Sequence, residues 1–221
     1  MRQLLIGLTA EGTTDIRFLK SVIAKSIQEL SWQCNQQIEI FEISEISAHG
    51  VSFVEKMLNA SKRAGQEGIT ILCIHADSDK RSIDMVMHNK FSPFFSELKQ
   101  MSEDEFCKHI IPTIPIQMIE SWMLADKALL RQLINAKKLN DKDLGIDKSP
   151  EQYADPKSVI ENAIRKSLSG ETKKKRDQIG IEDLYELLGN RLSLQSLRTI
   201  PSFVQFEENV MRVFKEIGLM R

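Results

Sequence analysis

Residues 69–80, ITILCIHADSDK, form the stretch that decides the fold of this chain. The first seven of these residues, Ile69 to His75, are mostly apolar and β-branched. Such a run predicts a strand that is buried on both faces, as the strands of a parallel sheet are. Two carboxylates one residue apart, Asp77 and Asp79, follow the strand. We therefore expect fixed negative charge at the carboxyl end of a strand, where open α/β sheets bind their ligands.

Paired acids at this position favour a metal site. Two close carboxylates repel each other unless a proton or a cation lies between them. A hard divalent metal is the usual cation, and Mg²⁺ typically takes one or two carboxylates together with substrate phosphates. An acidic turn that caps the next helix gives the same Asp-x-Asp pattern, so the pattern by itself carries little weight.

Two further acids are expected near the same edge of the sheet. Glu11 follows the first predicted strand, Leu4–Leu8, and Glu120 follows the fourth, Ile110–Ile116. Because the carboxyl ends of parallel strands share one edge, these acids and the Asp-x-Asp pair are predicted to converge there. The plainer interpretation of Glu11 is an acid that favours the dipole of the first helix, and that of Glu120 is a surface helix residue.

The order of predicted elements is typical of a parallel α/β sheet. Strands and helices alternate along the first half of the chain, which predicts βαβ units with right-handed crossovers. Two prolines in the fourth strand predict that it lies at an edge of the sheet or makes only a few ladder hydrogen bonds. The predicted fold is a mostly parallel four-stranded sheet flanked by helices. Its strands are 4–8, 37–44, 69–75 and 110–116, and its helices lie at about 16–30, 51–61 and 81–108, the last divided by Pro93.

The second half of the chain is predicted to be helical. A long helix is expected from Gln117 to about Ala136, a polar connector over 140–153, and a helix start at Asp155-Pro156. A stripe of phenylalanines indicates that the last helix packs into a core, and Trp122 is predicted to be a core residue as well. We accordingly predict an α/β domain over 1–125 and a helical C-terminal extension over 126–221 that packs on it.

Composition limits the class of protein. The 221 residues are 42% hydrophobic and 28% charged, which is ordinary for a soluble globular protein. A net charge of −1 gives no overall attraction for nucleic acid, so such binding would depend on a local patch or a metal. Three dispersed cysteines, no signal-peptide pattern and no stretch near the roughly 20 apolar residues of a membrane span predict a cytoplasmic protein that does not enter membranes.

Five further segments carry a family pattern: AEGTTDIRFL at 10–19, HADSD at 75–79, IPIQMIESWMLAD at 114–126, DPK at 155–157 and IPSFVQFEENV at 200–210. Glu11-Gly12 after one strand and Asp77-x-Asp79 after another are similar to the Toprim arrangement of topoisomerases, bacterial primases and OLD-type nucleases. More closely, the five segments resemble the DUF4276 family, whose members are Toprim-like, and the resemblance spans nearly the whole chain. One departure is Asp15, where the family usually has glutamate.

The resemblance implies a Toprim-like, Rossmann-like fold that acts on phosphodiester bonds. Asp77 and Asp79 would hold Mg²⁺ or Mn²⁺, and Glu11 would be a metal ligand or a general acid/base. Glu120 would complete a second metal site, as in OLD-type nucleases. The implied protein is a metal-dependent nuclease of a bacterial defence or mobile-element system, with nucleic acid as its substrate and an ATPase as its partner protein.

Related chemistries fit the sequence less well. A topoisomerase needs a tyrosine nucleophile, and neither Tyr153 nor Tyr185 lies in a recognisable motif, so water is the expected nucleophile. A primase would need zinc-ligand cysteine spacing, which the sequence lacks. A dehalogenase-type phosphatase has its Asp-x-Asp after the first strand rather than the third. The remaining alternative is a non-catalytic effector or regulatory subunit that binds an ATPase or nucleic acid. This alternative would be favoured if the four acids were too far apart to bind the same one or two metal ions.

Four further groups are weaker candidates for the site. His75 is either a ligand or proton donor or a packed strand-end residue. Lys80-Arg81 either contact a phosphate or are solvated, and Lys157, at a helix start, is a candidate ligand or carboxylate partner. The basic run Lys173–Arg176 either follows a nucleic-acid backbone or forms an exposed loop.

Overall fold

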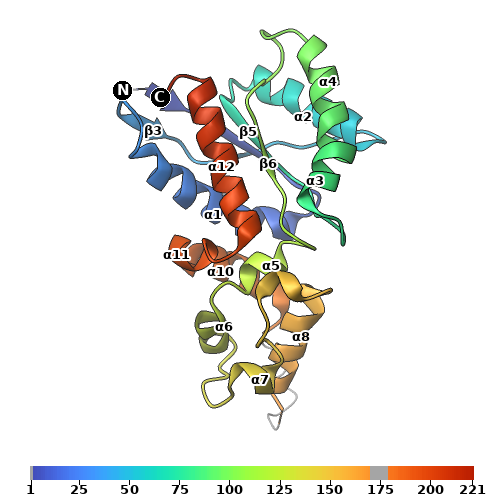
Figure 1. The fold of residues 1–221 in the computed structure, drawn as a ribbon, viewed down its shortest axis with the longest axis vertical. Helices are drawn as coiled ribbons and strands as arrows, with labels where there is room; N and C mark the ends of the chain where they lie inside the picture. The colour runs from blue at the N-terminus through green and yellow to red at the C-terminus, as the bar shows by residue number, and fades with distance from the viewer. Residues whose placement is uncertain (1, 170–178) are drawn as a thin grey trace.

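The computed structural model describes residues 2–169 and 179–221. Its main sheet has four strands in the order β4 (Ser44–Glu45), β2 (Ile6–Thr9), β5 (Ile71–His75) and β6 (Ile110–Thr113), and every neighbouring pair is parallel. The predicted four-stranded parallel sheet is thereby confirmed, with β5 inside it and buried along its whole length (Figure 1). β6 is an edge strand, which agrees with the proline at position 112.

The first two predicted strands are each divided in the structure. β1 (Arg2–Leu4) pairs with β3 (Ile38–Ile40) in a separate two-stranded parallel sheet, while β2 and β4 belong to the main sheet. The change of partner falls at Leu5, whose carbonyl oxygen accepts hydrogen bonds from the amides of Thr70 and Ile71 at 2.8 and 3.2 Å. The expectation of continuous strands over 4–8 and 37–44 is wrong, because backbone pairing and not hydrophobic pattern decides where each strand ends.

Helices cover both faces of the sheet, since successive strand residues point to opposite sides. Ile71 and Cys73 belong to a core with α1 (Thr13–Ser31) and α12 (Pro201–Glu216). Leu72 and Ile74 belong to a second core with α2 (Phe53–Gln66) and α4 (Ser92–Gln100). Figure 1 shows α12 crossing one face of the sheet while α2 and α4 lie together on the other side.

The segment before β6 contains an altered helical turn. α3 (Ile83–Val86) continues through a π-helical turn, η1 (Met87–Phe91), directly into α4. The amide of Ser92 donates to the carbonyl of Met87, five residues earlier. Pro93 stands at the first positions of α4, where a missing N–H is tolerated. The expected division at Pro93 therefore takes the form of a π-turn and not of a break.

The single long helix predicted after β6 is wrong. α5 (Glu120–Met123) is one turn, and α6 (Lys127–Leu133) starts anew because the Asp126 carboxylate accepts the Leu129 amide at 2.9 Å. The connector over 140–153 contains α7 (Asp141–Leu144) and the 3-10 turn η2 (Pro150–Gln152). The other elements are α8 (Pro156–Ser167), η3 (Ile181–Asp183), α10 (Leu184–Arg191) and α11 (Leu194–Leu197). Lys173–Arg176 lie outside the described residues.

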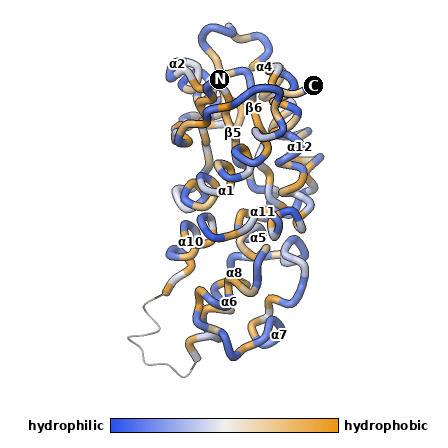
Figure 2. The backbone as a smooth tube through the Cα atoms, turned by 90° about the vertical axis from the view of Figure 1, so that its left-hand side faces the viewer, coloured by the Kyte–Doolittle hydropathy of each residue, from blue (hydrophilic) through white to orange (hydrophobic). Residues whose placement is uncertain are grey.

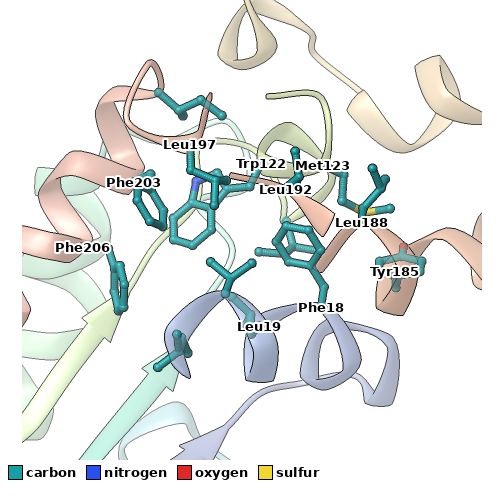
Figure 3. Close-up of a cluster of buried hydrophobic side chains, with 14 of the residues drawn as sticks. Phe18, Leu19, Trp122, Met123, Tyr185, Leu188, Leu192, Leu197, Phe203 and Phe206 are labelled. Carbon is teal, nitrogen blue, oxygen red and sulfur yellow. The ribbon is translucent and has the colours of Figure 1, made fainter. Parts of the chain in front are cut away.

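Figure 2 shows that α6, α7 and α8 form the end of the molecule away from the sheet. The predicted core residues meet between this end and the sheet. Trp122 packs edge-on against Phe203 at a centroid distance of 5.1 Å, and its Nε1 donates to the hydroxyl of Ser202 at 2.7 Å (Figure 3). Trp122, Phe203 and Phe206 are almost fully buried, so the prediction that they are core residues is confirmed. No helix in the described ranges has the length and apolar character to cross a membrane.

Candidate functional site

The parallel sheet brings the predicted acids to one edge. Glu11 lies in the turn between β2 and α1, Asp77 and Asp79 lie in the loop after β5, and Glu120 opens α5 after β6. β2, β5 and β6 are neighbours, so the four acids follow three adjacent strand ends. Glu11 and Asp79 are exposed, Asp77 is half-buried and Glu120 is buried. Sequence order and strand order together therefore produce the acidic edge.

His75, the last residue of β5, lies among these acids. Its side chain is only 2% exposed, its Nε2 is 3.2 Å from Asp77 Oδ1, and its Nδ1 is 3.8 Å from Asp15 Oδ2. Burial lowers the pKa of His75, but the carboxylates of Asp77, Asp15 and Glu11 outweigh it, so the pKa of His75 is raised. These close contacts are not hydrogen bonds. Among the described residues, neither ring nitrogen of His75 has a hydrogen-bond partner.

Asp15 is a member of the site that sequence reasoning noticed only as a departure from a family pattern. Its Oδ2 accepts the backbone amide of Gly12 at 3.2 Å, which fixes the carboxylate at the start of α1. Burial, and next the approach of Asp77, raise the pKa of Asp15, while a protonated His75 would lower it. The signal for this role was an acid in the first turn of a helix that follows a strand directly.

The loops that carry the acids have an unusual backbone. Asp79 and Lys80 have φ values of 48° and 68°, and Gln117 in the facing loop has 66°. The two loops are joined because the Gln117 amide donates to Ser78 Oγ at 2.7 Å and the Asp79 amide donates to the Gln117 carbonyl at 3.2 Å. Left-handed non-glycine residues are costly and cluster at functional sites. The arrangement therefore agrees with a functional role for this edge.

Glu120 is bound to a tyrosine that the sequence analysis set aside. The hydroxyl of Tyr185, in α10, donates to Glu120 Oε1. Burial raises the pKa of Glu120, whereas the bond from Tyr185 and the charge of Lys157 lower it, and the net direction is upward. Burial and the Glu120 carboxylate raise the pKa of Tyr185 strongly. The charge of Lys157 has the smallest of these effects, and within the described residues no ion pair joins Lys157 to Glu120, so the role of Lys157 stays a prediction.

The comparisons with known proteins place the chain in a family. Residues 10–210 match the family described as "Domain of unknown function (DUF4276)". The chain belongs to the DUF4276 family. No curated protein and no solved structure matches it. The resemblance to DUF4276 predicted from the sequence is thereby confirmed, and the Toprim relation stays a prediction.

The carboxylates at this edge of the DUF4276 protein are the groups that could bind a metal ion. Within residues 2–169 and 179–221, no group of three or more His, Cys, Asp or Glu side chains is arranged to hold a metal. The acids at this edge of the sheet therefore do not form a complete metal cage among the described residues. Mg²⁺ is commonly bound by one or two carboxylates, with substrate phosphates and water completing its octahedron. Glu11 and Asp77 are the candidates for such ligands, while Oε1 of Glu120 accepts a hydrogen bond from the Tyr185 hydroxyl.

Proposed function

We propose that this DUF4276 protein is a metal-dependent nuclease with a Toprim-like site, acting in a bacterial defence or mobile-element system. The observation that carries the proposal is the acidic edge at the ends of β2, β5 and β6, with His75 buried between Asp77 and Asp15. Buried ionisable groups with strongly perturbed pKa values are typical of catalytic sites. The left-handed loop residues beside Asp77 support the same assignment.

The roles of the residues follow from their surroundings. Asp77 and Glu11 would hold Mg²⁺ or Mn²⁺, with Asp79 as a further exposed carboxylate for the same ion or its waters. When bound, the ion would neutralise charge on the phosphoryl oxygens. His75 Nε2 lies 3.2 Å from Asp77 Oδ1, and a protonated His75 would stabilise the charge of that carboxylate. Glu120, bonded to Tyr185, acts as a positioning residue and not as a ligand in this proposal.

The test is the replacement of Asp77 by asparagine. Asp77→Asn keeps the shape of the side chain and removes its charge, so we expect Mg²⁺-dependent cleavage of labelled DNA or RNA to fall by about 10²-fold or more. The matched control is Asp84→Asn, which changes an exposed acid in the first turn of α3, and cleavage should stay at the wild-type rate. Both variants should show wild-type urea unfolding, because neither residue is in the core.

The alternative is a non-catalytic subunit that binds an ATPase or nucleic acid. The observation in its favour is the lack of a preformed three-ligand group within the described ranges. It predicts no divalent-metal-dependent cleavage of single- or double-stranded DNA or RNA by the wild type, and equal behaviour of wild type and Asp77→Asn. Cleavage by the wild type that survives in Asp77→Asn would refute the proposed role of the acidic edge.

A further inference from the structure

A cavity of about 410 Å³ opens beside the acids at the same edge of the sheet. Its walls come from the turn after β2, the loop after β4, the first turns of α2, the end of β5 and the π-turn η1. α2 and the α3–α4 segment lie on the same side of the sheet, as Figure 1 shows. The volume falls in the range of about 300–1,000 Å³ that small-molecule sites occupy.

Two lysines line this cavity, although the acids dominate the edge beside it. Lys56 extends from α2 and Lys90 from η1. The Nζ atom of Lys90 is 3.4 Å from the backbone oxygen of Asp77 and 5.8 Å from the centroid of the Phe53 ring. Within the described ranges, neither lysine forms an ion pair. Lys90 is therefore fixed at the wall of the cavity next to the proposed catalytic residues, and Lys56 is an exposed cation at the same wall.

The π-turn η1 places Lys90 at the wall of the cavity. A π-turn is rare and is found frequently at functional sites. The hydrogen bond from the Ser92 amide to the Met87 carbonyl marks the extra residue in the turn, and Lys90 lies within it. An extra residue rotates the following side chains about the helix axis. The position of Lys90 therefore depends on a feature that an ordinary α-helix would lack.

His75 supplies a second and independent observation. It lines the same cavity, it is 2% exposed, and in the described part of the chain neither ring nitrogen has a hydrogen-bond partner. Both nitrogens lie near carboxylates, Nε2 at 3.2 Å from Asp77 and Nδ1 at 3.8 Å from Asp15, so His75 places a protonatable ring at this wall of the cavity.

We propose that the cavity binds one nucleotide unit of the substrate strand, with its phosphate between Lys56 and Lys90. The phosphate would receive charge-assisted hydrogen bonds from the two ammonium groups. Phe53 and Met57 provide the apolar wall that the sugar and base would contact. The substrate class rests on the proposed nuclease function, and the subsite assigns to this cavity the nucleotide that adjoins the cleaved bond.

Glu11 fixes the orientation of the nucleotide. Its carboxylate also lines the cavity and repels a phosphate in the absence of a cation. The phosphate is therefore expected at the lysine side, while Glu11 faces the bond to be cleaved. This arrangement predicts opposite effects for two kinds of variant. Loss of a lysine charge weakens binding of a nucleotide, and loss of the Glu11 charge strengthens it.

The experiment is calorimetric titration of the full chain with thymidine 5′-monophosphate in EDTA, with thymidine as the uncharged comparison. Lys90→Met keeps the apolar stem over Phe53 and should weaken binding roughly tenfold, as should Lys56→Met. Glu11→Gln should strengthen it. The matched control is Lys62→Met, because Lys62 is also in α2 and also lies 5.8 Å from an aromatic centroid, that of Phe106, but outside the cavity. It should bind as the wild type does.

Several results would overturn the subsite. They are no binding of the monophosphate by the wild type at millimolar concentration, equal binding of thymidine, or equal weakening by Lys62→Met. The outcome is separable from that of the nuclease proposal. Cleavage that depends on Asp77 with unchanged nucleotide binding in the lysine variants would retain the nuclease and reject the subsite. Nucleotide binding that depends on the lysines, in the absence of any cleavage, would retain the subsite and reject the nuclease.

Discussion

The buried ionisable residues His75 and Glu120 differ in their hydrogen-bond partners. His75 lies between carboxylates without a hydrogen bond among the described residues, whereas Glu120 has a defined donor in the Tyr185 hydroxyl. An unbonded buried group is available for a ligand, and a bonded one is committed to the fold. We therefore assign a functional role to His75 and its neighbours and a positioning role to Glu120.

Glu120 predicts a pH dependence of stability. Its pKa in the folded chain is raised above the ordinary value of 4.5, chiefly by burial. From about pH 4.5 upward the folded chain thus holds a proton that the unfolded chain has lost, so this residue lowers the free energy of unfolding as pH rises. Glu120→Gln cannot ionise and still accepts from Tyr185. The variant should gain stability relative to the wild type as pH rises.

The measurement is urea unfolding of both proteins in EDTA at pH 4.5 and pH 8. The difference in the free energy of unfolding isolates Glu120, because all other titrating groups are shared. A larger advantage of Glu120→Gln at pH 8 agrees with the raised pKa. A variant that is relatively less stable at pH 8 would show that Tyr185 and Lys157 stabilise the ionised carboxylate more than burial penalises it.

At the scale of elements, the contact between α1 and α10 joins an early helix to one in the second half of the chain. Gly189 permits it, because a Cβ atom there would lie 2.7 Å from the carbonyl oxygen of Phe18 and 3.0 Å from its Cα. Lys25 of α1 completes the contact by donating to the carbonyls of Gly189 and Leu192 at 2.8 and 2.6 Å. Helices approach this closely only where a side chain is absent.

Gly189→Ala should therefore destabilise the protein. Alanine gains up to about 1 kcal/mol of helix propensity over glycine, but overlap with rigid backbone costs typically 1–3 kcal/mol, so we expect a net loss of about 1 kcal/mol. Thermal and urea unfolding measure it. The control is Gly180→Ala, where the nearest atom to a new Cβ is 3.8 Å away and little change is expected. Equal effects of the two variants would argue against the close contact.

At the scale of the whole molecule, the C-terminal helices return to the sheet. α12 packs on β6 and α1, and Figure 1 shows the two chain ends near each other at the same end of the molecule. Glu207 of α12 is buried and accepts from Arg198 at 2.7 and 2.8 Å and from Ser26 of α1 at 2.9 Å. Arg198 also contacts Glu29 of α1 at 2.7 Å. This network ties the last helices to the first.

Arg198→Met should loosen this connection. Removal of one partner leaves the buried carboxylate of Glu207 without its cation, which we expect to cost about 2 kcal/mol in the free energy of unfolding by urea. Arg212→Met removes an exposed partner of Glu216 on the same helix, at 2.6 Å, and should cost less than about 0.5 kcal/mol. If both variants lose the same stability, the network contributes no more than a surface pair.

The amino-acid sequence by itself determined the buried central strand, the parallel sheet and the place of Glu11, Asp77 and Asp79 at the ends of strands. Those features depend on local composition and on chain order, both of which can be read directly. It also indicated Trp122 and the phenylalanines as core residues, which their burial bears out. The strand breaks at Leu5 and the helix break at Asp126 were missed, since single hydrogen bonds set them.

Only the tertiary structure decided which side chains meet. The bond from Tyr185 to Glu120 joins residues 65 positions apart, and the approach of Asp15 to His75 joins the first turn of α1 to the end of β5. The cavity with Lys56 and Lys90 depends on a π-turn that periodicity does not reveal. Such contacts arise when segments that are far apart in the sequence pack together, and a sequence pattern does not give the distance between those segments in space. The acidic character of this sheet edge could therefore be predicted from the sequence, whereas the contacts between its side chains and the cavity beside it could not.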